Sequence, residues 1–338
     1  MDKPQQLPFV SVVMPVRNEA GYIARSLTAV TEQDYPRERM EIIVADGMST
    51  DSTREIVKLF QSRFGNIQLI DNPGKIAPTG LNRATEIAQG EIIARVDGHC
   101  EIAPDYIRNA VEHLQTENVD GVGGPIETIG ETAIADVIAA AMSSAFGVGG
   151  SAFRTIKGKT MLADTIAFPV YTRTIIQRAG GYDEELVRNQ DDEYNYRLRK
   201  LGAKLLLAAD VRSRYYSRGT MKKLFKQYFQ YGYWKVRVLQ KHPRQMSLRQ
   251  FIPPAFAASL LASMGLGLIS PLGWWILAGI IGCYLTVNLI ASARILLSNR
   301  PYQFQFFLLP AVFGSLHLSY GLGFLLGLVK FAPRWRMP

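Results

Sequence analysis

The sequence predicts an α/β fold with a mostly parallel, doubly wound sheet, followed by a region of apolar helices. In the N-terminal half, short β-rich runs alternate with stretches that carry apolar residues at helical spacing. This alternation is typical of a parallel sheet with crossover helices. Charged residues are frequent as far as Arg249 and nearly vanish after Phe251, where long apolar runs begin. The change in composition separates a globular part from an apolar part.

The predicted strands cover residues 9–14, 42–45, 67–70 and 92–96. The predicted helices between them cover residues 22–31, 52–64 and 81–89. In such sheets, ligands bind beyond the carboxyl ends of the strands. The loops at these ends are polar or glycine-rich, and we expect the site there, at residues 15–19, 46–51, 72–75 and 97–100.

We expect three parts: an α/β domain over residues 1–218, a basic amphipathic interfacial helix over 219–250, and a membrane domain over 251–338. Residues 221–240 mix Lys and Arg with aromatics at helical spacing, which is typical of a helix that lies in the membrane interface. A span needs ~20 apolar residues, and three segments have about this length, at 252–269, 274–293 and 304–329. Residues 133–150 fit either a helix on the sheet or a loop that touches the membrane.

The charge pattern indicates the partners and the compartment. The net charge is +9, and basic residues concentrate over residues 212–249. A basic cluster before a membrane segment favours a lipid bilayer with an anionic leaflet, and no nucleic acid is expected because no recognised motif accompanies the charge. Residues 1–8 lack a signal-peptide pattern, and Cys100 and Cys283 cannot form a disulfide framework. A cytoplasmic globular domain is therefore expected.

The positive-inside rule predicts the topology of the apolar segments. The uncharged linker at residues 270–273 fits outside, and the linker that contains Arg294 and Arg300 fits inside. A third crossing places Lys330 and Arg334 outside, against the rule. Pro310 and nearby glycines would permit the last segment to dip in and return. Its length matches one simple span, and we expect three crossings.

Four motifs carry a family resemblance: SVVMPVRNEA, IIVADGMSTDST, ARVDGH and VRNQDDEYNYRLRKLG. Their order and spacing resemble those of family 2 glycosyltransferases, and the chain looks most like the succinoglycan-type exopolysaccharide glucosyltransferases. The resemblance covers residues 9 to about 242, and more loosely the apolar part. It implies a GT-A fold, an inverting transfer, a UDP-sugar donor and a divalent metal, Mn²⁺ or Mg²⁺.

The resemblance assigns the donor site to the first three loops. It implies that Glu19 contacts the uracil ring, that Pro15 and Val16 line the base, and that Asp46 makes a second uridine contact. Asn18 belongs to the same loop, although it also suits the cap of the next helix.

The third loop adds Lys75, which with backbone N–H groups at a helix N-terminus suits a diphosphate; the alternative is a surface turn. Asp51 and Ser52 are expected to cap the following helix.

The metal site is expected at Asp97 and His99. The family carries Asp-x-Asp after this strand and binds there the metal that bridges the donor diphosphate. In this sequence the third position is histidine, and imidazole suits manganese better than magnesium. The alternative is a solvated Asp-Gly turn.

The general base is expected at Asp191, with Asp192 as the second choice. The family has Glu-Asp here and an arginine six residues after the Asp, so counting back from Arg197 gives Asp191 and places Gln190 where the Glu is expected. A positioned carboxylate can take the proton of an acceptor hydroxyl. Asp192 is expected to cap the helix, and Glu193 to pair with Arg197 at i, i+4.

Gln230, Tyr233 and Trp234 resemble the Gln-x-x-Arg-Trp motif of processive synthases, with tyrosine in the place of the arginine. They suit an acceptor groove or an amphipathic helix on the bilayer, and the missing arginine argues against a processive polymerase. The expected enzyme works at the bacterial inner membrane on a polyprenyl-linked saccharide acceptor. Its rivals are a sugar nucleotidyltransferase, whose Gly-rich basic loop is not found, and a non-catalytic membrane scaffold that binds nucleotide-sugar.

Overall fold

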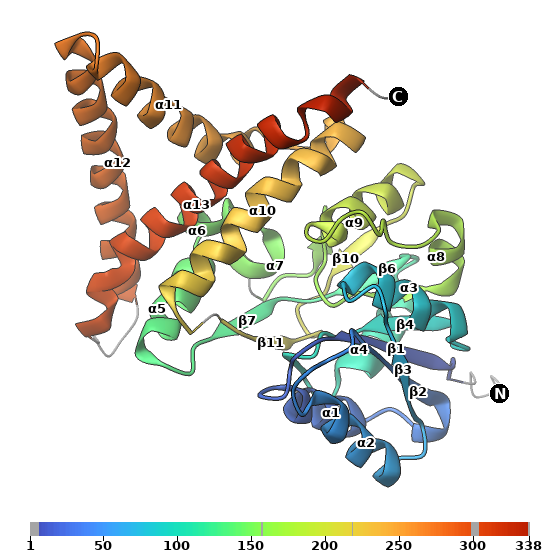
Figure 1. Cartoon of the computed structure of the whole chain (residues 1–338). Coiled ribbons are helices and arrows are strands. Elements are labelled where there is room, and N and C mark those ends of the chain that lie inside the picture. Colours follow the sequence, from blue (N-terminus) through green and yellow to red (C-terminus); the bar gives the residue numbers. More distant parts are fainter. Residues whose placement is uncertain (1–6, 157, 218, 299–303, 337–338) are drawn as a thin grey trace. The chain divides into compact units, whose positions relative to one another are not determined.

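The computed structural model describes residues 7–156, 158–217, 219–298 and 304–336 (Figure 1). Its contacts divide the chain into two units, residues 1–127 with 152–215 and residues 128–151 with 216–338. This division differs from the expected three parts. The helix expected at the interface belongs with the apolar helices because it packs along one of them, and residues 128–151 join them for the same reason.

The first unit is built on an eight-stranded sheet with the order β3-β2-β1-β4-β9-β6-β10-β8. The four predicted strands are confirmed and form its parallel half: β1 Val10–Val16, β2 Met40–Asp46, β3 Ile67–Asp71 and β4 Ile92–Arg95. The other half is mixed, since β9 runs antiparallel to both its neighbours. Its strands are β6 Gly121–Gly123, β8 Met161–Leu162, β9 Val170–Thr172 and β10 Leu205–Leu207. A smaller sheet has the order β5-β11-β7, with β5 Cys100–Ile102, β7 Ile126–Ile129 and β11 Ser213–Tyr216.

The predicted crossover helices are confirmed as α1 Ile23–Thr31, α2 Thr53–Arg63 and α3 Ala77–Ile87. The last begins four residues earlier than predicted, because proline is accepted in a first helical turn and Pro78 stands there. Leu81 and Ala84 of α3 pack on Val13, Ile43 and Ile93 of the sheet to form one core. The remaining helices of this unit are η1 Arg37–Arg39, α4 Tyr106–Thr116, α7 Ala152–Thr155, α8 Arg173–Ala179 and α9 Gln190–Lys200.

The second unit is helical. Residues 133–150, which the sequence left open, contain two helices, α5 Ala133–Met142 and α6 Ala145–Val148. The expected amphipathic helix is α10 Met221–Lys241. The apolar segments form α11 Ile252–Gly267, α12 Pro271–Ser298 and α13 Leu309–Lys330. Short 3₁₀ turns complete the unit: η2 Pro243–Gln245, η3 Leu248–Phe251, η4 Phe304–Leu308 and η5 Ala332–Arg336.

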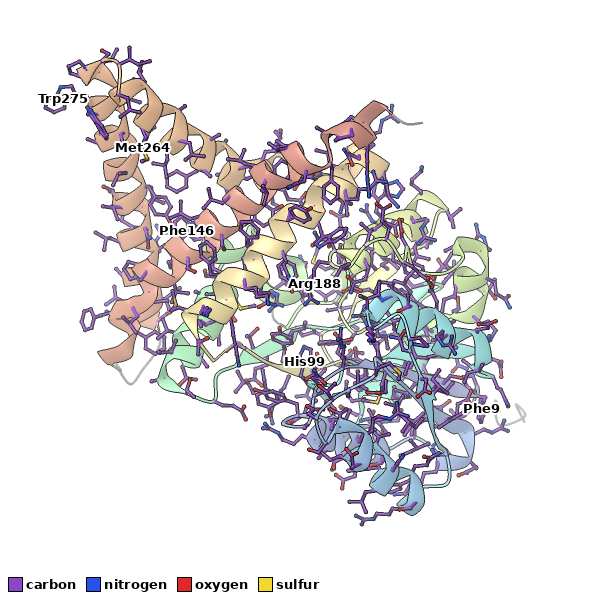
Figure 2. All side chains as sticks on the ribbon, in the orientation of Figure 1. Phe9, His99, Phe146, Arg188, Met264 and Trp275 are labelled. Carbon is purple, nitrogen blue, oxygen red and sulfur yellow. The ribbon has the colours of Figure 1, made fainter. Side chains whose placement is uncertain are left out.

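Two helices in the described part of the chain are long and apolar enough to cross a membrane, Pro271–Ser298 and Phe306–Lys330. The segment at 252–269, which the sequence predicted as a span, is shorter than expected: α11 has 16 residues, and at 1.5 Å per residue it extends about 24 Å, less than the ~30 Å of a hydrocarbon core. The last segment does not break at Pro310, because proline lies in the first turn of α13 and leaves the helix continuous to Lys330. Figure 2 shows Trp275 at the tip of the α11–α12 hairpin, where its side chain is 77% exposed.

Candidate active site

The loops after β1, β2 and β3 share an unusual backbone. Asn18, Met48 and Lys75 each have a positive φ, of 53°, 55° and 60°. A left-handed conformation is costly for residues other than glycine, and such residues gather at functional sites. All three lie at the carboxyl ends of parallel strands, where the sequence placed the site. Figure 2 labels Phe9, which precedes β1, and His99, which follows the neighbouring parallel strand β4, so the two mark opposite ends of these strands.

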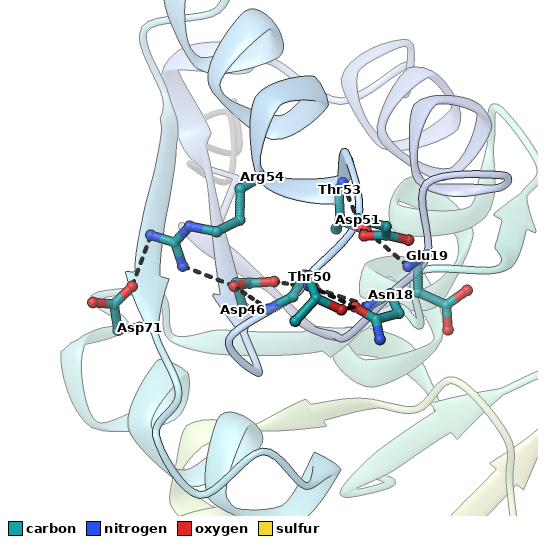
Figure 3. A network of polar contacts seen from close by, with 9 residues as sticks. Asn18, Glu19, Asp46, Thr50, Asp51, Thr53, Arg54 and Asp71 are labelled. Carbon is teal, nitrogen blue, oxygen red and sulfur yellow. Dashed lines mark hydrogen bonds and ion pairs between the residues drawn. The ribbon is translucent and has the colours of Figure 1, made fainter.

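Asp46 ends β2 with a fully buried side chain. Its carboxylate accepts hydrogen bonds from the Ser49 hydroxyl at 2.5 Å and backbone N–H at 3.0 Å, and pairs with Arg54 at 2.7 Å. Arg54 also pairs with Asp71 at the end of β3, at 2.8 Å (Figure 3). Buried charges need partners of this kind. In this arrangement Asp46 shapes the loop, and its expected contact with uridine stays a prediction.

The loop of Asn18 and Glu19 is tied to the start of α2 (Figure 3). The Asn18 side-chain oxygen accepts the Thr50 backbone N–H at 2.8 Å, so Asn18 does not cap α1, which starts after Tyr22. Asp51 accepts the N–H of Thr53 at 3.1 Å and that of Ala20 at 3.2 Å. The predicted capping role of Asp51 is therefore confirmed, whereas Ser52 makes no side-chain cap bond.

The two remaining donor-site residues of the first loop lie against glycines. A Cβ on Gly98 would lie 3.0 Å from a Val16 methyl, and one on Gly80 would lie 3.3 Å from Pro15. Glycine at these positions lets the turn after β4 and the helix α3 approach the first loop closely. Pro15 and Val16 are thus closely packed at the carboxyl ends of the strands.

Lys75 lies two residues before α3, and its backbone carbonyl accepts a bond from Arg17 at 3.2 Å. Asn72, buried beside it, holds the turn by bonding Ile76 at 2.9 Å and Thr79 at 2.8 Å. A helix N-terminus with a lysine next to it favours an anion.

Glu19 and His99 meet across the first and fourth loops. Nδ1 of His99 lies 3.0 Å from Oε1 of Glu19, and about a fifth of each side chain is exposed. Burial lowers the pKa of His99, but the hydrogen bond and charge of Glu19 outweigh it and raise the pKa to about 9. The sequence assigned these residues to the base and to the metal separately, and did not predict that they would be partners.

Asp97 and His99 would fit a divalent metal once His99 has lost the proton that its pair with Glu19 retains, because only a neutral imidazole binds an ion. The remaining ligands would come from the substrate. Within the described residues, no group of three His, Cys, Asp or Glu side chains is placed to hold an ion. Ions of this type are usually bound by one or two protein side chains together with phosphate oxygens and water. One carboxylate and one imidazole from the same turn match that use, and the imidazole suits manganese.

Arg95, the last residue of β4, joins the two halves of the site. Its guanidinium Nε and Nη2 donate to the two Asp97 carboxylate oxygens at 2.9 and 3.2 Å, and its Nη1 bonds Asp191. Burial alone lowers the pKa of Arg95, but the charges of Asp191 and Asp97 raise it well above its usual value. Sequence reasoning missed this residue. The signal was a charged residue at the end of an otherwise apolar strand.

Asp191 lies in the first turn of α9, and its side chain is 43% exposed. Desolvation raises the pKa of Asp191, Arg95 opposes that rise, and the nearby charge of Asp97 adds to it. A raised pKa suits a group that accepts a proton.

The start of α9 differs in detail from the prediction. Asn189 occupies the N-cap position with φ of 62° and makes no side-chain cap bond. Asp192 therefore lies inside the first turn instead of at the cap, because the helix begins at Gln190. The predicted pair of Glu193 and Arg197 is confirmed at 2.9 Å.

Gln230, Tyr233 and Trp234 all lie on α10, in the second unit. The Tyr233 and Trp234 rings pack against Phe331, with ring centroids at 4.9 and 5.6 Å. These two aromatics thus take part in helix packing, a role that the sequence did not predict, and their acceptor role stays a prediction.

Comparisons with known proteins agree on one family and one fold. The model of glycosyl transferase family 2 matches residues 11–179. The succinoglycan biosynthesis protein ExoA of Rhizobium meliloti is 31% identical over 277 residues, which cover 78% of this chain and 81% of that protein.

A second relative matches nearly the full length. It is the dolichyl N-acetyl-alpha-D-glucosaminyl phosphate 3-beta-D-2,3-diacetamido-2,3-dideoxy-beta-D-glucuronosyltransferase of Methanococcus voltae, 29% identical over 330 residues that cover 95% of this chain and 98% of that protein. Among solved structures, the mannosyltransferase PcManGT from Pyrobaculum calidifontis, in complex with GDP-Man and Mn²⁺, has a TM-score of 0.60. It covers 97% of this chain and 91% of its own at 17% identity, so this likeness concerns the fold.

Proposed function

Because this chain belongs to glycosyltransferase family 2, we propose that it moves a sugar, glucose in the first instance, from a UDP-sugar to a saccharide acceptor on a polyprenyl diphosphate. The transfer inverts the anomeric carbon and serves exopolysaccharide biosynthesis. The enzyme works from the cytoplasmic face of a bacterial inner membrane. The functions of the two relatives, one in succinoglycan biosynthesis and one on a dolichyl-linked sugar, support the acceptor class.

One observation carries the proposal. Asp97 and Asp191 are 94 positions apart in the sequence, yet both bond the same buried guanidinium of Arg95. A transferase of this kind needs a donor-side carboxylate beside an acceptor-side carboxylate, and the fold brings these two together. The second group remains open enough to meet an acceptor, since 43% of the Asp191 side chain is exposed.

Each loop then has a task. Pro15, Val16, Asn18 and Glu19 surround the base, Asp46 supports the uridine side, and Lys75 faces the diphosphate. Asp97 and His99 would hold the divalent ion, which stabilises the charge that develops on the leaving diphosphate. Asp191 accepts the proton of the acceptor hydroxyl as that oxygen attacks the anomeric carbon, and the carbon–oxygen bond to UDP breaks. The residues proposed to contact the acceptor from α10 are Gln230, Tyr233 and Trp234.

The test is a screen of UDP-sugars with membrane extract as the acceptor, in which UDP release is followed and the product is identified by mass spectrometry. Transfer from UDP-glucose supports the full proposal, and transfer from another UDP-sugar corrects the donor. Nucleotide-sugar binding without UDP release under every condition would instead indicate a scaffold.

The proposed base gives a sharper prediction. Asp191→Asn should keep UDP affinity near normal and lower the transfer rate ~10²-fold or more, which is the usual scale for loss of a general base. Asp192→Asn is the matched control, one residue along the same helix turn, and should keep most of the activity. The reverse result, an active Asp191 variant and an inactive Asp192 variant, moves the base by one residue.

A further inference from the structure

Arg95 lies at a buried position, where a charged side chain loses its hydration. It closes the strand Ile92–Arg95, each of whose residues is buried, and its own side chain is 7% exposed. A charge in such a place is retained only with close partners, because desolvation costs several kcal/mol. The charged partners that the fold supplies are two carboxylates, Asp97 in the turn after β4 and Asp191 in the first turn of α9, and the Tyr182 side chain also bonds Arg95.

The bonds of Arg95 set a geometry as well as a charge balance. A planar guanidinium offers donors in fixed directions, so that a fork on one carboxylate defines where the remaining nitrogen points. Here Nε and Nη2 form the fork on Asp97, at 2.9 and 3.2 Å. Nη1 then meets Asp191. The position of Asp97 therefore determines, through one rigid group, where the Asp191 carboxylate lies.

We propose that Arg95 is a positioning residue: it holds Asp191 at a fixed place relative to Asp97, so that the base faces the acceptor when the donor is bound. The inference rests on the proposed function, in which Asp97 serves the donor and Asp191 the acceptor. In this proposal Arg95 acts through the two carboxylates.

A second arginine provides the matched control. Arg173 and Arg95 line the same cavity of about 320 Å³, together with Asn82, Tyr182 and Tyr194. Arg173, however, donates to the backbone carbonyls of Gly90 and Ala88, both at 2.6 Å. Arg173 thus stabilises the backbone of the loop before β4, whereas Arg95 bonds the side chains of Asp97 and Asp191. The cavity also gives a small cation access to the space that a shortened Arg95 would leave.

The experiment uses the full-length protein in detergent or native membranes. We expect Arg95→Ala to lower kcat ~10²-fold, since a misplaced reacting group costs about that much. Donor KM should change less than kcat does, because the displaced base acts only on the transition state. Guanidinium chloride at millimolar concentration should restore part of kcat. Arg95→Lys keeps the charge without the fork, so kcat should be intermediate.

The controls separate positioning from folding. Arg173→Ala should lower stability, because it loses two bonds to backbone carbonyls, but should keep kcat and show no response to guanidinium. Asp191→Asn should not be rescued. A rise in donor KM with unchanged kcat in the Arg95 variants would overturn the proposal, as would a folded Arg95→Ala that guanidinium does not restore. If Arg95→Ala does not fold, Arg95→Lys decides: a lower kcat at constant KM supports positioning, and a wild-type kcat rejects it. Absence of transfer by the wild-type chain would refute the proposed function itself, which is a separate result.

Discussion

At the scale of single residues, Arg54 shows how the strand ends tolerate buried charge. It is partly exposed, pairs with the fully buried Asp46 at 2.7 Å and extends to Asp71 at 2.8 Å. The three residues link α2 to the ends of β2 and β3. The cost of burying Asp46 therefore depends on one arginine from the neighbouring helix.

Removing that arginine should be costly. Arg54→Ala leaves the Asp46 carboxylate buried without its cation, and such losses destabilise by about 3 kcal/mol. Asp71→Asn is the control, because Asp71 is 55% exposed and exposed pairs contribute less than about 1 kcal/mol. Thermal unfolding followed by circular dichroism measures both. Equal and small shifts would show that Ser49 alone satisfies Asp46.

The metal preference belongs to His99. Because imidazole replaces the family's second carboxylate, manganese should support turnover better than magnesium, and calcium should do so poorly. His99→Asp should narrow the difference between manganese and magnesium. The measurement is transfer rate against metal identity after removal of bound ions. Full activity in EDTA would eliminate the metal from the mechanism.

The sequence motifs indicated candidate loops for the site because the identity of a motif residue is visible in a sequence. Their partners were not visible. Glu19 and His99 are 80 positions apart, and Arg95 and Asp191 are 96 apart, so only the folded sheet brings each pair together. The positive φ of Met48 and Lys75 also escaped prediction, since neither residue type favours that conformation.

At the scale of elements, the hydrophobic periodicity of the sequence predicted the strands and helices better than it predicted which strands pair. The parallel strands and crossover helices were predicted correctly because short apolar runs and helical spacing repeat clearly through the N-terminal half. The predicted GT-A class is confirmed. The antiparallel strand β9, between β4 and β6, was not predicted, since three residues, Val170–Thr172, are too short a run to be distinguished.

Packing in the second unit depends on glycine. The helices α10 and α13 run along each other, and their backbones approach at Gly232 and Gly323. A Cβ on Gly323 would lie 2.0 Å from the Phe229 carbonyl oxygen, and one on Gly232 would lie 2.0 Å from that of Tyr320. Small residues of this kind allow close approach between helices in membrane proteins.

Gly323→Ala should therefore destabilise this unit by about 1–3 kcal/mol, the usual cost of overpacking. Gly314→Ala lies on the same helix with open space around the added carbon and should be neutral or slightly stabilising. All 4 tryptophans lie in this unit, at positions 234, 274, 275 and 335, so tryptophan fluorescence during thermal unfolding reports it selectively. A Gly323 variant as stable as the Gly314 variant would contradict the close approach.

At the scale of the whole molecule, the burial of the last apolar helix bears on its membrane topology. Of the most apolar 18-residue stretch of the last helix, 44% is buried inside the protein, whereas the corresponding stretch of α12 is 11% buried. Much of that cover comes from α10, which presents Lys222, Lys223 and Lys226 on its exposed surface. Carrying these charges into hydrocarbon costs about 2.5–3.5 kcal/mol each at the bilayer centre. A helix that packs along α10 is more favourably placed with it at the membrane interface.

We therefore predict two crossings, by the α11–α12 hairpin, instead of the three that segment length suggested. The 16 residues of α11 fall short of the hydrocarbon thickness, so this arrangement requires local thinning of the bilayer around α11. The arrangement keeps Lys330 and Arg334 on the same side as Arg249 and Arg294, which agrees with the positive-inside rule. A variant lacking Cys100 and Cys283 can carry one new cysteine at Trp335, which is 49% exposed. An impermeant thiol reagent should leave this cysteine unlabelled on intact cells and label it once the membrane is opened.

Two matched positions calibrate the labelling. A cysteine in place of Trp275, at the exposed hairpin tip, should be labelled on intact cells, because the tip lies between two crossings. A cysteine in place of Ser62, on the exposed face of α2, should remain protected with the catalytic domain. If the Trp335 variant is labelled like the Trp275 variant, α13 crosses the membrane. Since α10 cannot follow it at the cost above, the contacts between the two helices would then have to separate in the bilayer.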